Sequence, residues 1–140
     1  EVAKKFEEAD GIVVGSPVYY AGPNGTLVSF LNRLFYSSHF SKTMKVGAAV
    51  VSCRRGGATS TFDQINKYFA MNNMPIVTSQ YWNMVHGATP DDVRKDEEGM
   101  QIMRILGRNM AYYLKCIEAG KQNGIERPAS EKKLRTNFIR

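Results

Sequence analysis

Residues 11–25 read Gly11-Ile12-Val13-Val14-Gly15-Ser16-Pro17-Val18-Tyr19-Tyr20-Ala21-Gly22-Pro23-Asn24-Gly25. The β-branched run at 12–14, placed between glycines, predicts a strand buried on both faces of a parallel sheet. Because Pro17 lacks a backbone donor and restricts the residue before it, we expect the strand to stop there. Aromatic, proline and glycine residues follow, and they predict a loop with many free backbone N–H groups before a helix resumes at about Thr26. Ligands bind at the carboxyl ends of parallel strands, so we expect this loop to hold a flat ligand.

Two further apolar segments predict strands. Residues 45–52 read as a second strand that is apolar on both faces, and residues 75–80 as a shorter, more polar third strand at the edge of the sheet. Apolar residues at helical spacing predict helices near 1–9, 26–35 and 60–71, with Thr59 or Ser60 capping the last of these. Thr89-Pro90 predicts the start of one final helix that ends at Gly120. Gly99 is a candidate kink in it.

The alternation of strands and helices predicts an α/β fold with a parallel sheet and right-handed crossovers. A chain of 140 residues is long enough for one domain and too short for two. We expect residues 1–120 to form the domain and residues 121–140 to form an extended basic tail. Three strands leave the strand at 12–16 without cover on its far side. We therefore expect further N-terminal elements there, or a partner chain.

Composition excludes several classes of protein. No run of eighteen apolar residues exists and the start lacks the pattern of a signal peptide, so neither a membrane span nor a membrane partner is expected. Two cysteines without metal spacing favour the cytoplasm. The net charge of +6 is concentrated in the tail 121–140, where Phe138 alone is poor support for a nucleic-acid site. We interpret the tail as a solvated or subunit-wrapping arm, and the absence of a starting methionine as the mark of a longer chain.

Three blocks of sequence carry a family resemblance. Residues 15–20 with 25–27, residues 52–57 (Ser-Cys-Arg-Arg-Gly-Gly) and residues 81–87 (Tyr-Trp-Asn-Met-Val-His-Gly) follow one another in order. Together they resemble the flavodoxin-like NAD(P)H-dependent FMN reductases. The resemblance implies a three-layer α/β/α fold, bound FMN, and NADPH or NADH as reductant. It also implies a homo-oligomer, a dimer or tetramer, with contacts through residues 81–95 and the tail. Such proteins begin with strands and a phosphate-binding loop that nothing in this chain resembles.

The resemblance places the candidate cofactor-binding residues in two loops. They are Ser16, Pro17, Val18, Tyr19, Tyr20, Asn24 and Gly25 in the first, and Cys53, Arg54, Arg55, Gly56 and Gly57 in the second. A flavin needs backbone groups along its pyrimidine edge and an apolar or aromatic cover over its ring. The two tyrosines suit the ring, the two glycines allow close approach, and an arginine suits the edge where the reduced flavin accumulates negative charge.

Each of these assignments has a structural alternative. The tyrosines can instead pack against a neighbouring helix or subunit, and Asn24 is equally suited to capping the helix that follows it. The arginines can be solvated surface residues, and Cys53 is more typical of a small packed residue than of a redox thiol. His86 and Trp82 are candidates for lining the mouth of the site, although a lone histidine between loop residues is more often structural.

The leading hypothesis is an FMN-dependent oxidoreductase that passes hydride from NAD(P)H through FMN to a quinone, a flavin or another small acceptor. One alternative is a flavodoxin-like or iron–sulfur flavoprotein electron carrier. Such carriers are usually acidic, whereas this chain is basic. Another is a truncated module without flavin. No metal-ligand cluster or Ser/His/Asp arrangement is visible, and hydride transfer through a flavin requires no catalytic side chain of the protein.

Overall fold

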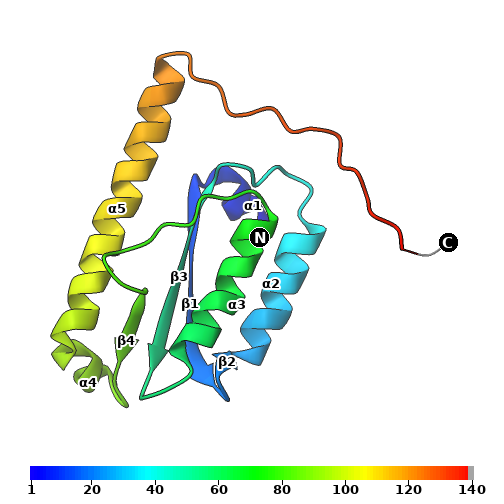
Figure 1. Ribbon diagram of the computed structural model, residues 1–140. Helices are drawn as coiled ribbons and strands as arrows, with labels where there is room; N and C mark the ends of the chain where they lie inside the picture. Colours follow the sequence, from blue (N-terminus) through cyan, green and yellow to red (C-terminus); the bar gives the residue numbers. More distant parts are fainter. Residues whose placement is uncertain (139–140) are drawn as a thin grey trace.

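The computed structural model describes residues 1–138. Its helices are α1 (Val2–Glu8), α2 (Gly25–Ser37), α3 (Ala58–Met71), α4 (Pro90–Lys95) and α5 (Glu97–Gln122). Its strands are β1 (Gly11–Tyr19), β2 (Gly22–Pro23), β3 (Val46–Cys53) and β4 (Met84–His86). Figure 1 shows α2 and α3 on one face of the sheet and α5 on the other. The expected three-layer α/β/α arrangement is confirmed.

The sheet has the strand order β2-β1-β3-β4. β1 and β3 run parallel in register from Gly11 opposite Val46 to Pro17 opposite Ser52. β4 adds a parallel strand to the other side of β3, whereas the two-residue β2 pairs antiparallel with the end of β1. The carboxyl ends of β1, β3 and β4 therefore lie at one edge, where the chain enters its loops.

Apolar packing holds the helices to both faces. Phe69 and Ile65 of α3 are fully buried against the sheet, and each contributes about 2 kcal/mol by leaving water. A Cβ at Gly47 would lie 2.6 Å from the Phe69 ring, so only glycine allows this close approach. On the opposite face, Leu106 of α5 packs with Val46 and neighbouring residues.

β1 is longer than the sequence predicts. It continues through Pro17 to Tyr19, and then turns back into β2 through Tyr20 and Ala21, whose φ angles are 48° and 57°. Positive φ at both central residues is typical of a tight two-residue hairpin. A proline fits because β1 has no strand on its second edge along 11–17, as far as the chain is described. The prediction that the strand stops at Ser16-Pro17 was wrong, and fewer backbone N–H groups are free than expected.

The third predicted strand is interrupted. Of residues 75–80, only Ile76 forms a bridge, with Gly47. Regular pairing resumes at β4, where Met84 lies opposite Val51. Between these pairings β3 advances four residues, from 47 to 51, while its partner advances eight, from 76 to 84. The extra residues bulge outward, so the segment expected as a loop, 81–89, contains the true edge strand.

The predicted final helix is two helices. A capping box formed by Thr89 and Asp92 starts α4, and Asp96 ends it and caps α5 through the N–H of Gly99. The break is therefore at Asp96, where a side-chain cap replaces the kink expected at Gly99. α5 ends at Gln122, two residues beyond the predicted end.

The second half of α5 extends past the sheet (Figure 1). For this reason Tyr113 is 44% exposed, whereas Ile102 and Leu106, in the first half of the helix, are buried. Beyond Gly124 the described part of the tail has no regular structure, and residues 139–140 of the predicted tail lie outside the described residues. Along residues 1–138, no helix combines the length and apolar character that crossing a bilayer requires.

Candidate functional site

The two predicted loops meet at the carboxyl end of the sheet. A Cβ at Gly57 would lie 2.7 Å from the Cα of Ala21 and 3.0 Å from Val18 Cγ1, so the backbones of the loops are in close contact. The Ser60 hydroxyl donates to the carbonyl of Ala21 at 2.5 Å and thereby ties α3 to the β1–β2 turn. Loops joined by residues 39 positions apart in sequence therefore form one surface.

Gly57 fixes the second loop. Its φ is +85°, a left-handed conformation that glycine adopts without steric cost, and it is the N-cap residue of α3. The caps predicted at Thr59 or Ser60 are therefore wrong. No side chain caps α3, and the Thr61 hydroxyl instead donates to the Gly57 carbonyl at 2.9 Å, with the Ser60 hydroxyl oxygen 3.1 Å from the same carbonyl. The first backbone N–H groups of α3 consequently face the loop surface.

Tyr19 and Tyr20 stand at the tip of the first loop. Their exposed fractions are 57% and 107%, so neither packs against a helix of this chain. Tyr20 and Ala21 hold positive φ angles that cost about 1 kcal/mol each for residues other than glycine. Strain of this kind is found at ligand sites, where the surroundings hold it. The turn thus presents an aromatic ring outward from a fixed backbone.

The remaining first-loop residues are mainly structural. Asn24 accepts from the Leu27 N–H with its side-chain oxygen and donates its own N–H to Ser16, which is buried. Both groups are thereby used within the protein, and the amide nitrogen of the Asn24 side chain is the group available to a ligand. Pro17 lies within β1, and Gly25 begins α2 in open space.

In the second loop, the charged residues are exposed to solvent and the cysteine is packed in the core. Arg54, Arg55 and Gly56 are exposed. Cys53 is 6% exposed and belongs to the core. Burial raises the pKa of its thiol and outweighs the lowering effect of the Arg55 backbone N–H. A neutral, buried thiol favours the packed role for Cys53, and leaves the arginines as the groups that can reach a ligand.

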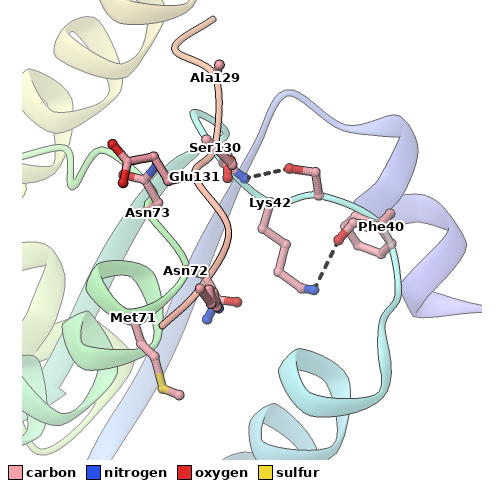
Figure 2. A pocket seen from close by; sticks show the side chains of 11 residues that line it. Phe40, Lys42, Met71, Asn72, Asn73, Ala129, Ser130 and Glu131 are labelled. Carbon is pink, nitrogen blue, oxygen red and sulfur yellow. Dashed lines mark hydrogen bonds between the residues drawn. The ribbon is translucent and has the colours of Figure 1, made fainter. Parts of the chain in front are cut away.

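A different cavity lies at the amino end of the sheet. It has a volume of about 420 Å³ between the loop before β3, the end of α3 and the tail. Figure 2 shows the Lys42 ammonium pointing away from Asn72 and Asn73, toward the Phe40 carbonyl. Because the ammonium of the buried Lys42 is already hydrogen-bonded to the backbone carbonyls of Ser38 and Phe40, this cavity is a poor match for an anionic ligand.

Sequence reasoning missed two residues of the site. Ala21 provides the contact with Gly57, and Ser60 the hydrogen bond that joins the loops. Neither an alanine in a turn nor a serine near a helix start is distinctive in sequence. A positive φ at a residue other than glycine becomes visible only in three dimensions.

Comparison with known proteins identifies the family. The sequence profile of the NADPH-dependent FMN reductases matches residues 1–89. The chain belongs to this family. The match covers both candidate loops and ends just before α4, so the family relationship rests on the part of the chain that builds the site.

Curated relatives of this FMN reductase family member are named iron-sulfur flavoproteins. The chain is 35% identical to an iron-sulfur flavoprotein of Methanocaldococcus jannaschii over 126 residues, covering 84% of this chain and 65% of that protein. An iron-sulfur flavoprotein of Methanosarcina thermophila is 28% identical, with coverages of 86% and 64%. The chain thus spans just under two thirds of the length of these curated relatives.

Solved structures support the fold. A WrbA-like flavodoxin protein from Agrobacterium tumefaciens superposes with a TM-score of 0.53 at 16% identity, covering 76% of this chain and 71% of that one. A flavodoxin from the domain Archaea gives 0.53 at 20% identity, with coverages of 76% and 69%. The flavodoxin-like fold of this FMN reductase family member is therefore confirmed.

Proposed function

We propose that this chain is an FMN-dependent oxidoreductase that takes hydride from NADPH or NADH and passes electrons to a quinone, a flavin or another small acceptor. The observation that carries the proposal is the joined surface of the two loops, tied by the Ser60–Ala21 hydrogen bond and the Gly57 contact. The family membership of residues 1–89 supports the same cofactor.

The residues present fit the ring portion of FMN. Tyr20 offers a fully exposed aromatic face, the uncapped start of α3 offers N–H donors, and the arginines at 54 and 55 offer positive charge. Bound FMN would supply the redox chemistry, accepting a hydride and releasing electrons singly or in pairs. The chain's own part is to hold the ring flat, cover it and stabilise negative charge at its edge. No described segment resembles a loop for the FMN phosphate.

Titration of FMN into the protein, followed by flavin fluorescence, tests the cofactor assignment. We expect quenching with a Kd in the micromolar range or below. Anaerobic oxidation of NADPH and NADH with a naphthoquinone acceptor then tests the reaction. Saturable FMN binding without nucleotide oxidation would contradict the reductase role, and absence of both binding and a flavin absorbance band would favour a module without flavin.

The names of the curated relatives favour a second candidate, an iron–sulfur flavoprotein electron carrier. An iron–sulfur cluster takes four cysteine ligands. The sequence has two, Cys53 buried at the end of β3 and Cys116 exposed on α5. Within residues 1–138 no group of three or more His, Cys, Asp or Glu side chains could hold a metal ion. The residues present do not fit a cluster, and we derive no step through one.

We further propose that the protein works as a homo-oligomer. Tyr81 and Trp82 form an aromatic pair with ring centroids 5.0 Å apart and are each about half exposed. With Phe62 they border an open hollow of about 480 Å³. An exposed aromatic cluster of this kind is typical of a subunit interface. A monomeric mass by light scattering at micromolar concentration would contradict the proposal.

A further inference from the structure

The last described part of the tail has the sequence pattern of a half-buried strand. Over residues 133–138, charged or polar residues at 133, 135 and 137 alternate with Leu134, Thr136 and Phe138. Alternate residues of an extended chain share a face, so Leu134 and Phe138 lie on one side and Lys133 and Arg135 on the other. This alternation is typical of a strand with one buried face. Residues 133–138, the tail segment, therefore have an apolar side that calls for a partner.

The tail segment has no cover from its own domain. Leu134 is 96% exposed and Phe138 is 91% exposed. The residues just before it, from Ala129 to Glu131, border the cavity at the amino end of the sheet (Figure 2). The tail then continues past the side of α2, away from β4 (Figure 1). Its apolar side chains consequently project beyond the domain that carries them.

An exposed aromatic surface lies on the β4 side of the same domain. This aromatic hollow is bordered by Phe62 of α3, Tyr81 and Trp82, and the last two are 55% and 50% exposed. It lies along the bulge at the edge of the sheet, where strand pairing is suspended. Because the tail of a chain runs away from this edge, its tail segment is directed to the hollow of a neighbouring molecule rather than to its own (Figure 1).

The charges around the two surfaces are complementary. The tail carries three cations close together, Lys132, Lys133 and Arg135. Beside the aromatic hollow, Asp63 follows Phe62 on α3. Glu97 lies one helical turn before Gln101, whose side chain is hydrogen-bonded to that of residue 80. Both acids are exposed, and within residues 1–138 neither forms an ion pair. Lys67 is the one basic residue of α3, so the surroundings of the hollow favour a basic segment.

We propose that the tail segment of one chain docks in the aromatic hollow of a second copy, with Leu134 and Phe138 against the rings of Phe62, Tyr81 and Trp82. The inference rests on the homo-oligomer proposed above and names the segment that fills its interface. Residues 125–138 can span about 45 Å when extended, which is enough to cross to a neighbouring molecule. In a two-fold dimer the contact is reciprocal, since each chain gives one tail and receives one.

Tryptophan fluorescence reports on the hollow directly, because Trp82 is the one tryptophan of the sequence. The double variant Leu134→Ser/Phe138→Ser removes both apolar contacts and keeps the charges. We expect its Trp82 emission to move to longer wavelength and to be quenched more strongly by acrylamide. Association measured by sedimentation should weaken by at least about tenfold, since two buried apolar anchors are lost. Tyr36→Ser, which removes an exposed aromatic residue of α2, should change none of these quantities.

Mixing two full-length chains tests whether the docking occurs between molecules. Trp82→Phe protein has no tryptophan and keeps its tail, so its emission does not interfere. Added in excess to the Leu134→Ser/Phe138→Ser protein, it should return the Trp82 emission of that protein toward shorter wavelength. The triple variant Leu134→Ser/Phe138→Ser/Trp82→Phe lacks the tail contacts as well, and should give no such return.

The outcomes separate this inference from the proposed function. An oligomer whose Trp82 emission and quenching are the same with and without the Leu134 and Phe138 side chains overturns the inference and leaves the homo-oligomer intact. Shielding of Trp82 that is independent of concentration and is not restored by mixing also overturns it, because the tail then docks within its own chain. A monomeric mass for the wild-type protein removes both the homo-oligomer and the inference. FMN titrations of the same samples test the flavin assignment separately.

Discussion

The two ends of the sheet differ in the burial of their basic side chains. At the amino end, Lys42 and Lys45 are only 6% and 7% exposed, and each donates to backbone carbonyls. At the carboxyl end, Arg54 and Arg55 are exposed and no described interaction satisfies them. The lysines at the amino end therefore complete the fold, whereas the two arginines at the carboxyl end remain exposed to solvent.

Helix polarity explains the contrast. The chain brings the ends of α1, α2 and α3 to the amino side of the sheet, where their free carbonyls carry partial negative charge. Lys45 donates to the carbonyls of Glu7, in the last turn of α1, and Ala9, its C-cap, and Lys42 donates to that of Ser38 after α2. The beginnings of α2, α3 and α5 lie at the other side, where N–H groups attract oxygen-rich ligands.

Removing a buried lysine should have the largest effect on stability. In Lys45→Met, the carbonyls of Glu7 and Ala9 lose their donor, and we expect the free energy of unfolding to fall by about 3 kcal/mol. Urea denaturation measures it. Lys4→Met, at an exposed position of α1, is the matched control. Equal stabilities for the two variants would show that the amino-end cations are dispensable.

Gly57→Ala should be next in size and act at the other end. The added Cβ would meet Ala21 at 2.7 Å in a backbone with φ of +85°. We expect a loss of about 2 kcal/mol and at least a tenfold weaker FMN affinity, because the two loops must separate. Gly56→Ala, where nothing lies within 4 Å, controls for the loss of a glycine. A Gly57→Ala protein that binds FMN normally would show that the loop contact is not needed.

Asp96→Asn should have a smaller, pH-dependent effect. Burial alone would raise the pKa of Asp96, but hydrogen bonds from the Gly99 and His86 N–H groups, with the charge of His86, hold that pKa below 3.8. A lowered pKa means that the ionised carboxylate stabilises the fold above about pH 4 and that this is lost as the pH falls through the folded-state value. We expect a cost of about 1.5 kcal/mol at pH 7 that shrinks toward pH 3. Urea titrations at both pH values measure it, and a cost independent of pH would contradict this account.

Tyr20→Ala should leave stability unchanged and weaken FMN binding. The ring is fully exposed, so its removal loses no packing within the chain. Thermal denaturation and FMN titration separate the two effects. Tyr36→Ala, at another exposed tyrosine on α2, is the control and should change neither. Equal FMN affinity in the two variants would assign stacking to another residue.

Sequence alone predicts the parts of this molecule that depend on local pattern. The β-branched runs of β1 and β3 and the amphipathic α2 lie where they are predicted, because burial on one or both faces imposes that pattern. The edge strand β4 was misplaced because three paired residues carry little periodicity. Pro17 was misjudged because its effect depends on whether the strand has a neighbour on its second edge.

In the candidate site, too, features set by local sequence pattern are predictable, and features set by the docking of separate elements are not. Loop blocks at the ends of two strands are predictable, since glycines and aromatics mark them. The contact of Gly57 with Ala21, and the pairing of His86 with Asp96, depend on how separate elements dock. A histidine that looks isolated in sequence gains its partner only when α5 begins beside β4.

The bulge between Ile76 and Met84 makes the edge of the sheet tolerant of insertions. Since strand pairing is already suspended there, residues can be added or removed without shifting the register at either side. The bulge carries Tyr81 and Trp82, half exposed, at its tip. Evolution can therefore vary the length and aromatic content of this edge, while the loops after β1 and β3 keep their places.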